Sequence, residues 1–189
     1  MAKKTKRSQV QEIIKCGKDP NYFFKNYLKI QHPVRGLIPF DTFPFQDECV
    51  DKFNDHRFNI VLKSRQLGLS TLVAAYSVWM AIFQREKNIL IIATKLAVAQ
   101  NFIIKVKTML RSLPKWLMIP EITANNKQMV QFNHGSQIKA IPTSEDAGRS
   151  EALSLLIVDE AAFVRNFDTI WTGIYPTIST GGRVIILST

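Results

Sequence analysis

Short apolar runs separated by amphipathic segments predict strands that alternate with helices along most of the chain. The runs at residues 58–62, 88–94, 153–158 and 183–188 predict strands, and the last three are apolar enough to be buried in a parallel sheet. Because helical patterns lie between these runs, we expect an α/β fold with a mainly parallel central sheet flanked by helices.

The helical segments show apolar positions that recur every three or four residues. They are residues 10–15, 22–30, 46–54, 68–83, 96–113 and 167–178. Pro176 can end the last of these helices early, and the prolines and glycine of residues 33–44 predict an irregular connection. Two short apolar stretches flank Asn133-His-Gly-Ser136, a sequence typical of a β-hairpin.

Length and composition indicate one domain that binds a polyanionic partner or ligand. The 189 residues include 25 lysines and arginines against 15 acidic residues, so the net charge is 25 − 15 = +10. Part of the excess lies in residues 1–20, which we expect to form a basic tail with a short helix. Cys16 and Cys49 lack the spacing of a metal site, and no apolar run is long enough to cross a bilayer.

The main domain is expected to span residues 21–189. The sequence stops inside or just after the predicted strand at residues 183–188. A natural domain rarely ends on a buried strand that nothing covers. We therefore expect the chain to be a fragment or a split product, truncated at its C-terminus.

The polar turn after residues 58–62 resembles a phosphate-binding loop. Its sequence is Lys63-Ser-Arg-Gln-Leu-Gly-Leu-Ser-Thr71, in which Gly68 and Ser70 match the pattern G-x-x-x-x-G-K-[ST]. The usual lysine position holds Leu69, and the first glycine position holds Lys63. Backbone N–H groups at the start of the following helix favour phosphate, and Lys63 could fold back to supply the missing charge. The alternative is a strand, turn and helix that bind no ligand.

A second motif changes the balance between these alternatives. The stretch Leu153-Ser-Leu-Leu-Ile-Val-Asp-Glu160 is apolar and ends in two acids, as a Walker B strand does. Asp159 would hold Mg²⁺ together with Ser70 of the loop, and Glu160 would polarise the attacking water. Both motifs fall at carboxyl ends of strands, where ligand sites of parallel sheets lie. Together they favour a nucleotide site over a chance pair of acids.

With both motifs placed, residues 22–189 resemble the N-terminal ATPase domain of the large terminase subunit of tailed bacteriophages. The matching segments, in the same order, are Phe43-Pro-Phe-Gln46, Ser64-Arg-Gln-Leu-Gly68, Ala147-Gly-Arg-Ser150, Ile157-Val-Asp-Glu-Ala161 and Leu187-Ser-Thr189. The resemblance implies a P-loop NTPase fold of the ASCE type. It also implies ATP hydrolysis with Mg²⁺ that drives double-stranded DNA into a viral procapsid, in the cytoplasm of the host cell.

The resemblance also implies roles for individual residues. Phe45 would stack on adenine while Gln46 reads the base edge, and Ser188 and Thr189 would couple hydrolysis to movement. The nucleotide-binding loop would comprise Lys63, Ser64, Arg65, Gln66, Leu67, Gly68, Leu69, Ser70 and Thr71. Some terminases carry the lysine at the first position of the loop, which Lys63 matches. Arg149 would reach the γ-phosphate of an adjacent subunit as an arginine finger, and Arg65 is the competing finger within its own subunit.

The implied partners are double-stranded DNA, contacted through its backbone, the portal protein and the small terminase subunit, with a homo-oligomeric ring as the working unit. The basic run Lys105, Lys107, Arg111 and Lys115 could face DNA phosphates, although such runs are usually solvated. A full terminase also carries a nuclease domain, and we expect no nuclease activity from this chain.

Two other functions stay open at this point. One is a helicase-like DNA translocase with the same two motifs. The other is a nucleotide-binding subunit of a packaging complex without turnover, which Leu69 favours. The direction of the Lys63 side chain separates them from a working motor with a moved lysine, because a Lys63 directed to solvent would indicate an inactive subunit.

Overall fold

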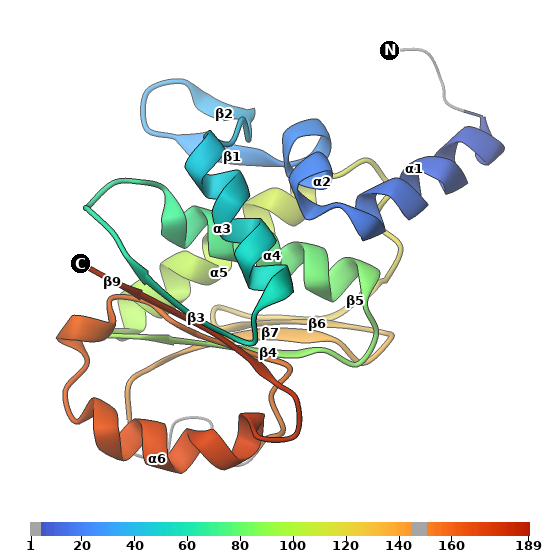
Figure 1. Cartoon of the computed structure of the whole chain (residues 1–189). Coiled ribbons are helices and arrows are strands. Elements are labelled where there is room, and N and C mark those ends of the chain that lie inside the picture. Colours follow the sequence, from blue (N-terminus) through green and yellow to red (C-terminus); the bar gives the residue numbers. More distant parts are fainter. Residues whose placement is uncertain (1–4, 145–150) are drawn as a thin grey trace.

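A twisted seven-stranded sheet forms the centre of the molecule (Figure 1). The computed structural model describes residues 5–144 and 151–189. The strands, in spatial order, are β3 (Phe58–Leu62), β9 (Arg183–Ser188), β8 (Leu155–Val158), β4 (Asn88–Ala93), β7 (Gln137–Pro142), β6 (Met129–Phe132) and β5 (Ile122–Asn125). The first five are parallel, whereas β6 and β5 are antiparallel to their neighbours. The predicted α/β class and the predicted hairpin of β6 and β7 are confirmed.

Helices cover both faces of this sheet (Figure 1). They are α1 (Lys6–Lys18), α2 (Pro20–Tyr27), α3 (Pro44–Asp55), α4 (Leu69–Phe83), α5 (Leu96–Ser112) and α6 (Phe167–Ile178). Side chains alternate along each strand, so β4 sends Ile89 and Ile91 into the core with α4 and α5. Its Leu90 and Ile92 belong to the second core, beneath α6.

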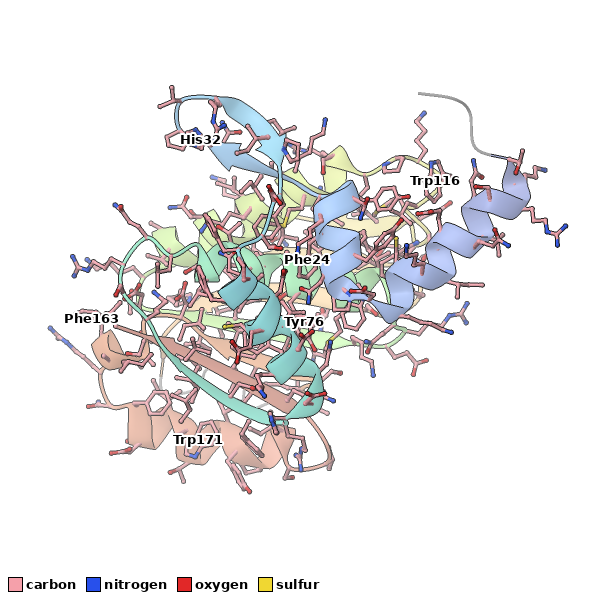
Figure 2. All side chains as sticks on the ribbon, turned by 45° about the horizontal axis from the view of Figure 1, so that its top comes forward. Phe24, His32, Tyr76, Trp116, Phe163 and Trp171 are labelled. Carbon is pink, nitrogen blue, oxygen red and sulfur yellow. The ribbon has the colours of Figure 1, made fainter. Side chains whose placement is uncertain are left out.

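Helix α4 is buried along almost its whole length because the sheet and the helices α2, α3 and α5 all pack against it. Figure 2 shows Phe24 and Tyr76 on this side of the sheet and Trp171 on the α6 side. The Tyr76 hydroxyl donates to Asn54 Oδ1 over 3.0 Å, which satisfies its polar end in the core. Burial raises the pKa of Tyr76 to about 12.

A hairpin of β1 (Lys29–His32) and β2 (Gly36–Pro39) replaces the end of the helix predicted over residues 22–30 and the start of the segment predicted as irregular. The helix expected over residues 22–30 therefore ends at Tyr27. The turn between the strands is stabilised locally, since His32 Nδ1 accepts hydrogen bonds from the backbone N–H groups of Val34 and Arg35. Gly36 has a φ of 70°, a left-handed backbone conformation that glycine adopts without a steric penalty.

Other boundaries also differ from the predictions. Strand β5 was not predicted, and α1 is longer than residues 10–15 because Thr5 caps its start by accepting a hydrogen bond from Ser8 N–H. Pro176 lies inside α6 without ending it. The helix continues because Ile170, Ile174 and Ile178 form an apolar face that packs on the sheet. Among the described residues, no helix is both long and apolar enough to cross a membrane.

Candidate nucleotide-binding site

The two sequence motifs meet at the carboxyl edge of the sheet. The P-loop follows β3, the two acids follow β8, and β9 lies between these strands. The backbone N–H of Lys63 donates to the carbonyl oxygen of Ser188 over 2.9 Å, so the base of the loop is fixed to the end of β9. Figure 1 shows the C-terminus beside the loop that joins β3 to α4. The structure thus brings the two motifs together where the sequence placed them.

The loop is shaped by residues with left-handed backbone conformations. Gly68 has φ 72° and stands immediately before α4, where a Cβ would lie 2.9 Å from Gln46 Nε2. Gln66 has φ 63°, and Glu160 on the opposite side of the site has φ 59°. Strained non-glycine residues of this kind persist only where the surrounding structure holds them, and they gather at functional sites. The loop encloses a cavity of about 410 Å³ together with Glu160 and Lys105.

The Gln46 side chain holds the P-loop through a hydrogen bond to its backbone. Its side chain is only 2% exposed, and Nε2 donates to the carbonyl oxygen of Leu67 over 2.9 Å. Its Oε1 accepts from the backbone N–H of Phe43 over 3.1 Å, which caps the start of α3. Both ends of the carboxamide are therefore bonded to backbone in this structure. Adenine recognition by Gln46 stays a prediction, and bracing of the loop is the contact that the structure shows.

Lys63 crosses the site and does not point to solvent. Its side chain is 7% exposed, and Nζ lies 3.1 Å from Oε1 of Glu160 in an ion pair. Leu69, at the usual lysine position, is 3% exposed and belongs to the core formed with α4 and α5. The structure therefore does not show the solvent-directed Lys63 that would have indicated an inactive subunit.

Asp159 has the features of a metal ligand. The residue is 5% exposed, and its Oδ1 is buried without a hydrogen-bond partner among the described residues. A buried carboxylate oxygen without a partner is costly unless a ligand completes it. Ser70, Asp159 and Glu160 line one cavity and supply only oxygen donors, which suit Mg²⁺. The residues present thus fit a magnesium ion.

Lys105 is the one charged residue of the described cavity lining that the motifs did not predict. It comes from the third turn of α5 and lines the cavity of the P-loop as well as the cavity of Ser70 and Asp159. Burial lowers the pKa of Lys105, the Asp159 carboxylate raises it, and the Lys63 ammonium lowers it. The expectation of one solvated basic run therefore fails for Lys105, which lines these cavities, whereas Lys107 Nζ donates to the carbonyl oxygen of Asn126 over 2.6 Å.

The remaining predicted residues that the structure describes are distributed around the site. Ser64, Arg65, Gln66 and Leu67 lie on the loop, and Thr71 is half-buried in the first turn of α4. Phe45 stacks on Phe43 with ring centroids 5.7 Å apart, beside a cavity of about 550 Å³ that Leu67 also lines. Ser188 accepts a hydrogen bond from Ala162 N–H at its Oγ, and Thr189 follows it. Arg149 lies outside the described residues.

A strand inserted between the P-loop strand and the acidic strand, with a glutamate after the latter, defines a P-loop NTPase fold of the ASCE type. Residues 60–189 match the family model for the large terminase subunit, T4likevirus-type, N-terminal. The chain belongs to this family of large terminase subunits. The resemblance based on the motifs is thus confirmed.

Solved structures of phage terminases share the fold. The HK97 bacteriophage large terminase has a TM-score of 0.72 and 19% sequence identity, and the match covers 92% of this chain and 37% of that one. The ATPase domain of the Thermus phage P74-26 large terminase has a TM-score of 0.57 and 20% identity, with 70% and 59% covered. The large terminase of a thermophilic bacteriophage, in complex with ATP-gamma-S, has a TM-score of 0.60 and 13% identity, with 78% and 38% covered.

Proposed function

We propose that this chain is an ATP-hydrolysing motor domain that drives double-stranded DNA into a viral procapsid. The observation that carries the proposal is the buried Lys63 ammonium, which lies across the P-loop cavity 3.1 Å from Glu160. A lysine in this position supplies the charge that Leu69 lacks. Membership of the large terminase family supports the DNA-packaging role, and the terminase complex with ATP-gamma-S supports nucleotide binding in this fold.

The chemistry requires a cradle for the phosphates and a group that activates water. The N-terminus of α4 directs backbone N–H groups at the cavity, and Lys63 and Arg65 add positive charge. Ser70 and Asp159 would hold Mg²⁺, which supplies charge neutralisation on the phosphate oxygens when it is bound. Glu160 polarises the attacking water, and it becomes available once the phosphates draw Lys63 away from it.

Two further features fit a nucleotide-driven motor. The base of ATP would occupy the cavity lined by Phe45, where the ring already stands parallel to Phe43 at an interplanar angle of 8°. Ser188 is hydrogen-bonded to the segments of both motifs. Its carbonyl oxygen accepts from the backbone N–H of Lys63, and its hydroxyl accepts from the backbone N–H of Ala162, just after Glu160. A shift of either motif during hydrolysis would therefore move the end of β9, as a coupling residue requires.

The motor would act as a ring in the host cytoplasm, on the portal protein and with the small terminase subunit. It would contact the DNA backbone without reading sequence, in line with a basic chain of net charge +10. Arg149 would complete the site of a neighbouring subunit, and Arg65, exposed on the loop, is the alternative finger. The domain division at residues 20 and 21 is part of the same proposal.

The decisive experiment is steady-state ATPase activity at high protein concentration with Mg²⁺, with Lys63→Ala, Leu69→Lys and Glu160→Ala as variants. We expect wild-type turnover that Lys63→Ala and Glu160→Ala abolish, because charge on the transferring phosphoryl and water activation are both lost. If the wild type binds ATP silently and Leu69→Lys restores turnover, the chain is instead a nucleotide-binding subunit and Lys63 does not replace the usual lysine.

The finger is assigned by mixing subunits. Arg149→Ala and Glu160→Ala proteins are each expected to be inactive, while their mixture regains part of the activity. The regained activity arises where an intact Arg149 meets a neighbour with an intact Glu160. Mixing Arg65→Ala with Glu160→Ala serves as the comparison, because a finger within its own subunit gives no such complementation.

A further inference from the structure

We propose that Lys105 binds the γ-phosphate of the nucleotide and makes the site prefer a triphosphate over a diphosphate. The inference rests on the proposed function, since it names a contact for the nucleotide of that site. It starts from the position of Lys105, which belongs to neither motif. The residue lies on α5, whereas the loop and the two acids come from the ends of β3 and β8.

Helix periodicity explains why α5 presents this side chain to the site. Val98, Asn101 and Lys105 are spaced three and four residues apart, and all three line the cavity of Asp159. Lys107, two positions further, is rotated by about 200° around the helix and bonds to Asn126 instead. Two lysines of one helix therefore have separate environments, and only Lys105 faces the site.

The charges around Lys105 favour an anion. Within the described part of the chain Lys105 forms no hydrogen bond and no ion pair, so its ammonium group is available to a ligand. Lys63 lines the same cavity and is itself committed to Glu160. An anion placed between the ammonium groups of Lys63 and Lys105 relieves their repulsion, and the N–H groups at the start of α4 attract it as well.

The location of the acids identifies which phosphate Lys105 would contact. Lys105 shares one cavity with Ser70, Asp159 and Glu160, the residues proposed for the metal and for water activation. Water attacks the γ-phosphorus, so the wall that carries Glu160 is the γ-phosphate side of the site. Lys105 thus supplies, from α5, part of the charge stabilisation that Leu69 cannot supply from the loop.

The test compares the affinities of ATP-gamma-S and ADP, each with Mg²⁺, for wild type, Lys105→Met and Lys107→Met. Because a hydrogen bond between charged groups is lost, we expect Lys105→Met to bind ATP-gamma-S about tenfold or more weakly. Its affinity for ADP should change by less than about threefold, as should both affinities of the matched control Lys107→Met. Lys105→Arg should recover part of the preference.

Each result is informative for a separate claim. If the wild type binds neither nucleotide, the proposed function fails and this inference fails with it. If the wild type binds both and Lys105→Met keeps its ratio of ATP-gamma-S to ADP affinity, only the inference is overturned, and Lys105 merely offsets the charge of Asp159.

A second measurement needs no variant and covers the case in which Lys105→Met does not fold. Wild-type protein is treated with an amine-acylating reagent, and the modified lysines are quantified by mass spectrometry. ATP-gamma-S with Mg²⁺ should protect Lys105 more than ADP with Mg²⁺ does, while Lys107 reacts equally in both. Equal modification of Lys105 with the two nucleotides, when both are bound, would contradict the inference.

Discussion

Removing Lys63 and removing Glu160, the two partners of one ion pair, should affect folding stability and nucleotide affinity in opposite orders. The pair is asymmetric, because the Lys63 side chain is 7% exposed and that of Glu160 is 32% exposed, with 3.1 Å between Nζ and Oε1. Removing one partner of a fully buried pair costs about 3–5 kcal/mol. We expect Glu160→Ala to cost about 2–3 kcal/mol of unfolding free energy, since it strands a buried ammonium group, and Lys63→Met to cost about 1 kcal/mol.

Nucleotide binding should reverse this order. Lys63→Met removes a charged hydrogen bond to phosphate, which is worth about 1.5–3 kcal/mol, so the affinity for a non-hydrolysable ATP analogue should fall about tenfold or more. Glu160→Ala removes the group that competes with phosphate for Lys63, so the affinity should hold or rise by up to about tenfold. Both variants should lose turnover.

Urea unfolding followed by circular dichroism gives the two stabilities, and fluorescence anisotropy of a labelled analogue gives the two affinities. The double variant Lys63→Met/Glu160→Ala closes the cycle and measures the coupling directly. The reasoning is refuted if Glu160→Ala weakens nucleotide binding as much as Lys63→Met does. In that case Lys63 would keep its bond to Glu160 in the bound state and would not reach phosphate.

Three further changes test the construction of the site and of the sheet beside it. Gly68→Ala should cost about 2–3 kcal/mol in urea unfolding, because φ 72° disfavours a Cβ and that atom would meet Gln46 Nε2 at 2.9 Å; combining it with Gln46→Ala should cost less than the sum. Leu69→Lys should lower the melting temperature by removing a buried side chain, at a cost of about 1.5–3 kcal/mol. Glu151 accepts a hydrogen bond from Lys139 Nζ over 2.9 Å, and this bond together with one from Asn88 lowers the pKa of Glu151. The Glu151 carboxylate therefore adds to folding stability above its ordinary pKa, and this stability is lost as the pH falls through the lowered pKa. Glu151→Gln should therefore reduce the acid-induced loss of unfolding free energy by less than about 1 kcal/mol, because Lys139 and Glu151 are both over one-third exposed. A pH dependence of stability equal to that of the wild type would argue against the interaction.

The sequence predicted the inner parallel strands well because burial on both faces makes such strands continuous apolar runs, and the edge strand β3 was found because it is equally apolar although Ile60 and Leu62 are exposed. The bounds of β3 and β9 agree with the predicted ones, and those of β4 and β8 differ at one end only. The hairpin of β1 and β2 gave no such signal, because its strands are short, half-exposed and interrupted by polar residues. Strand β5 lies at the sheet edge with a single large apolar residue, Ile122, and was missed for the same reason.

Site residues that belong to sequence motifs at strand ends were predictable, whereas a site residue placed by helix packing was not. Lys63, Asp159 and Glu160 follow directly from strand ends, and the structure brings Lys63 and Glu160 together. Lys105 could not be separated from Lys107 by composition, since both appear as one basic run. The signal lay in the helical phase of Val98, Asn101 and Lys105, but it identifies a site-facing side only once the position of α5 on the sheet is known.

The absence of lysine at position 69 has a physical explanation in this fold. Leu69 is the first residue of α4 and packs into the core, where a charged side chain would have to be paired or expelled. Lys63 leaves the end of β3 at the same cavity, and its backbone is already fixed by the bond to Ser188. Phosphate recognition depends on where the ammonium group lies and not on which Cα carries it. In the proposed mechanism, a lysine from the base of the loop and a second lysine from α5 therefore supply the charge while the first turn of α4 stays part of the core.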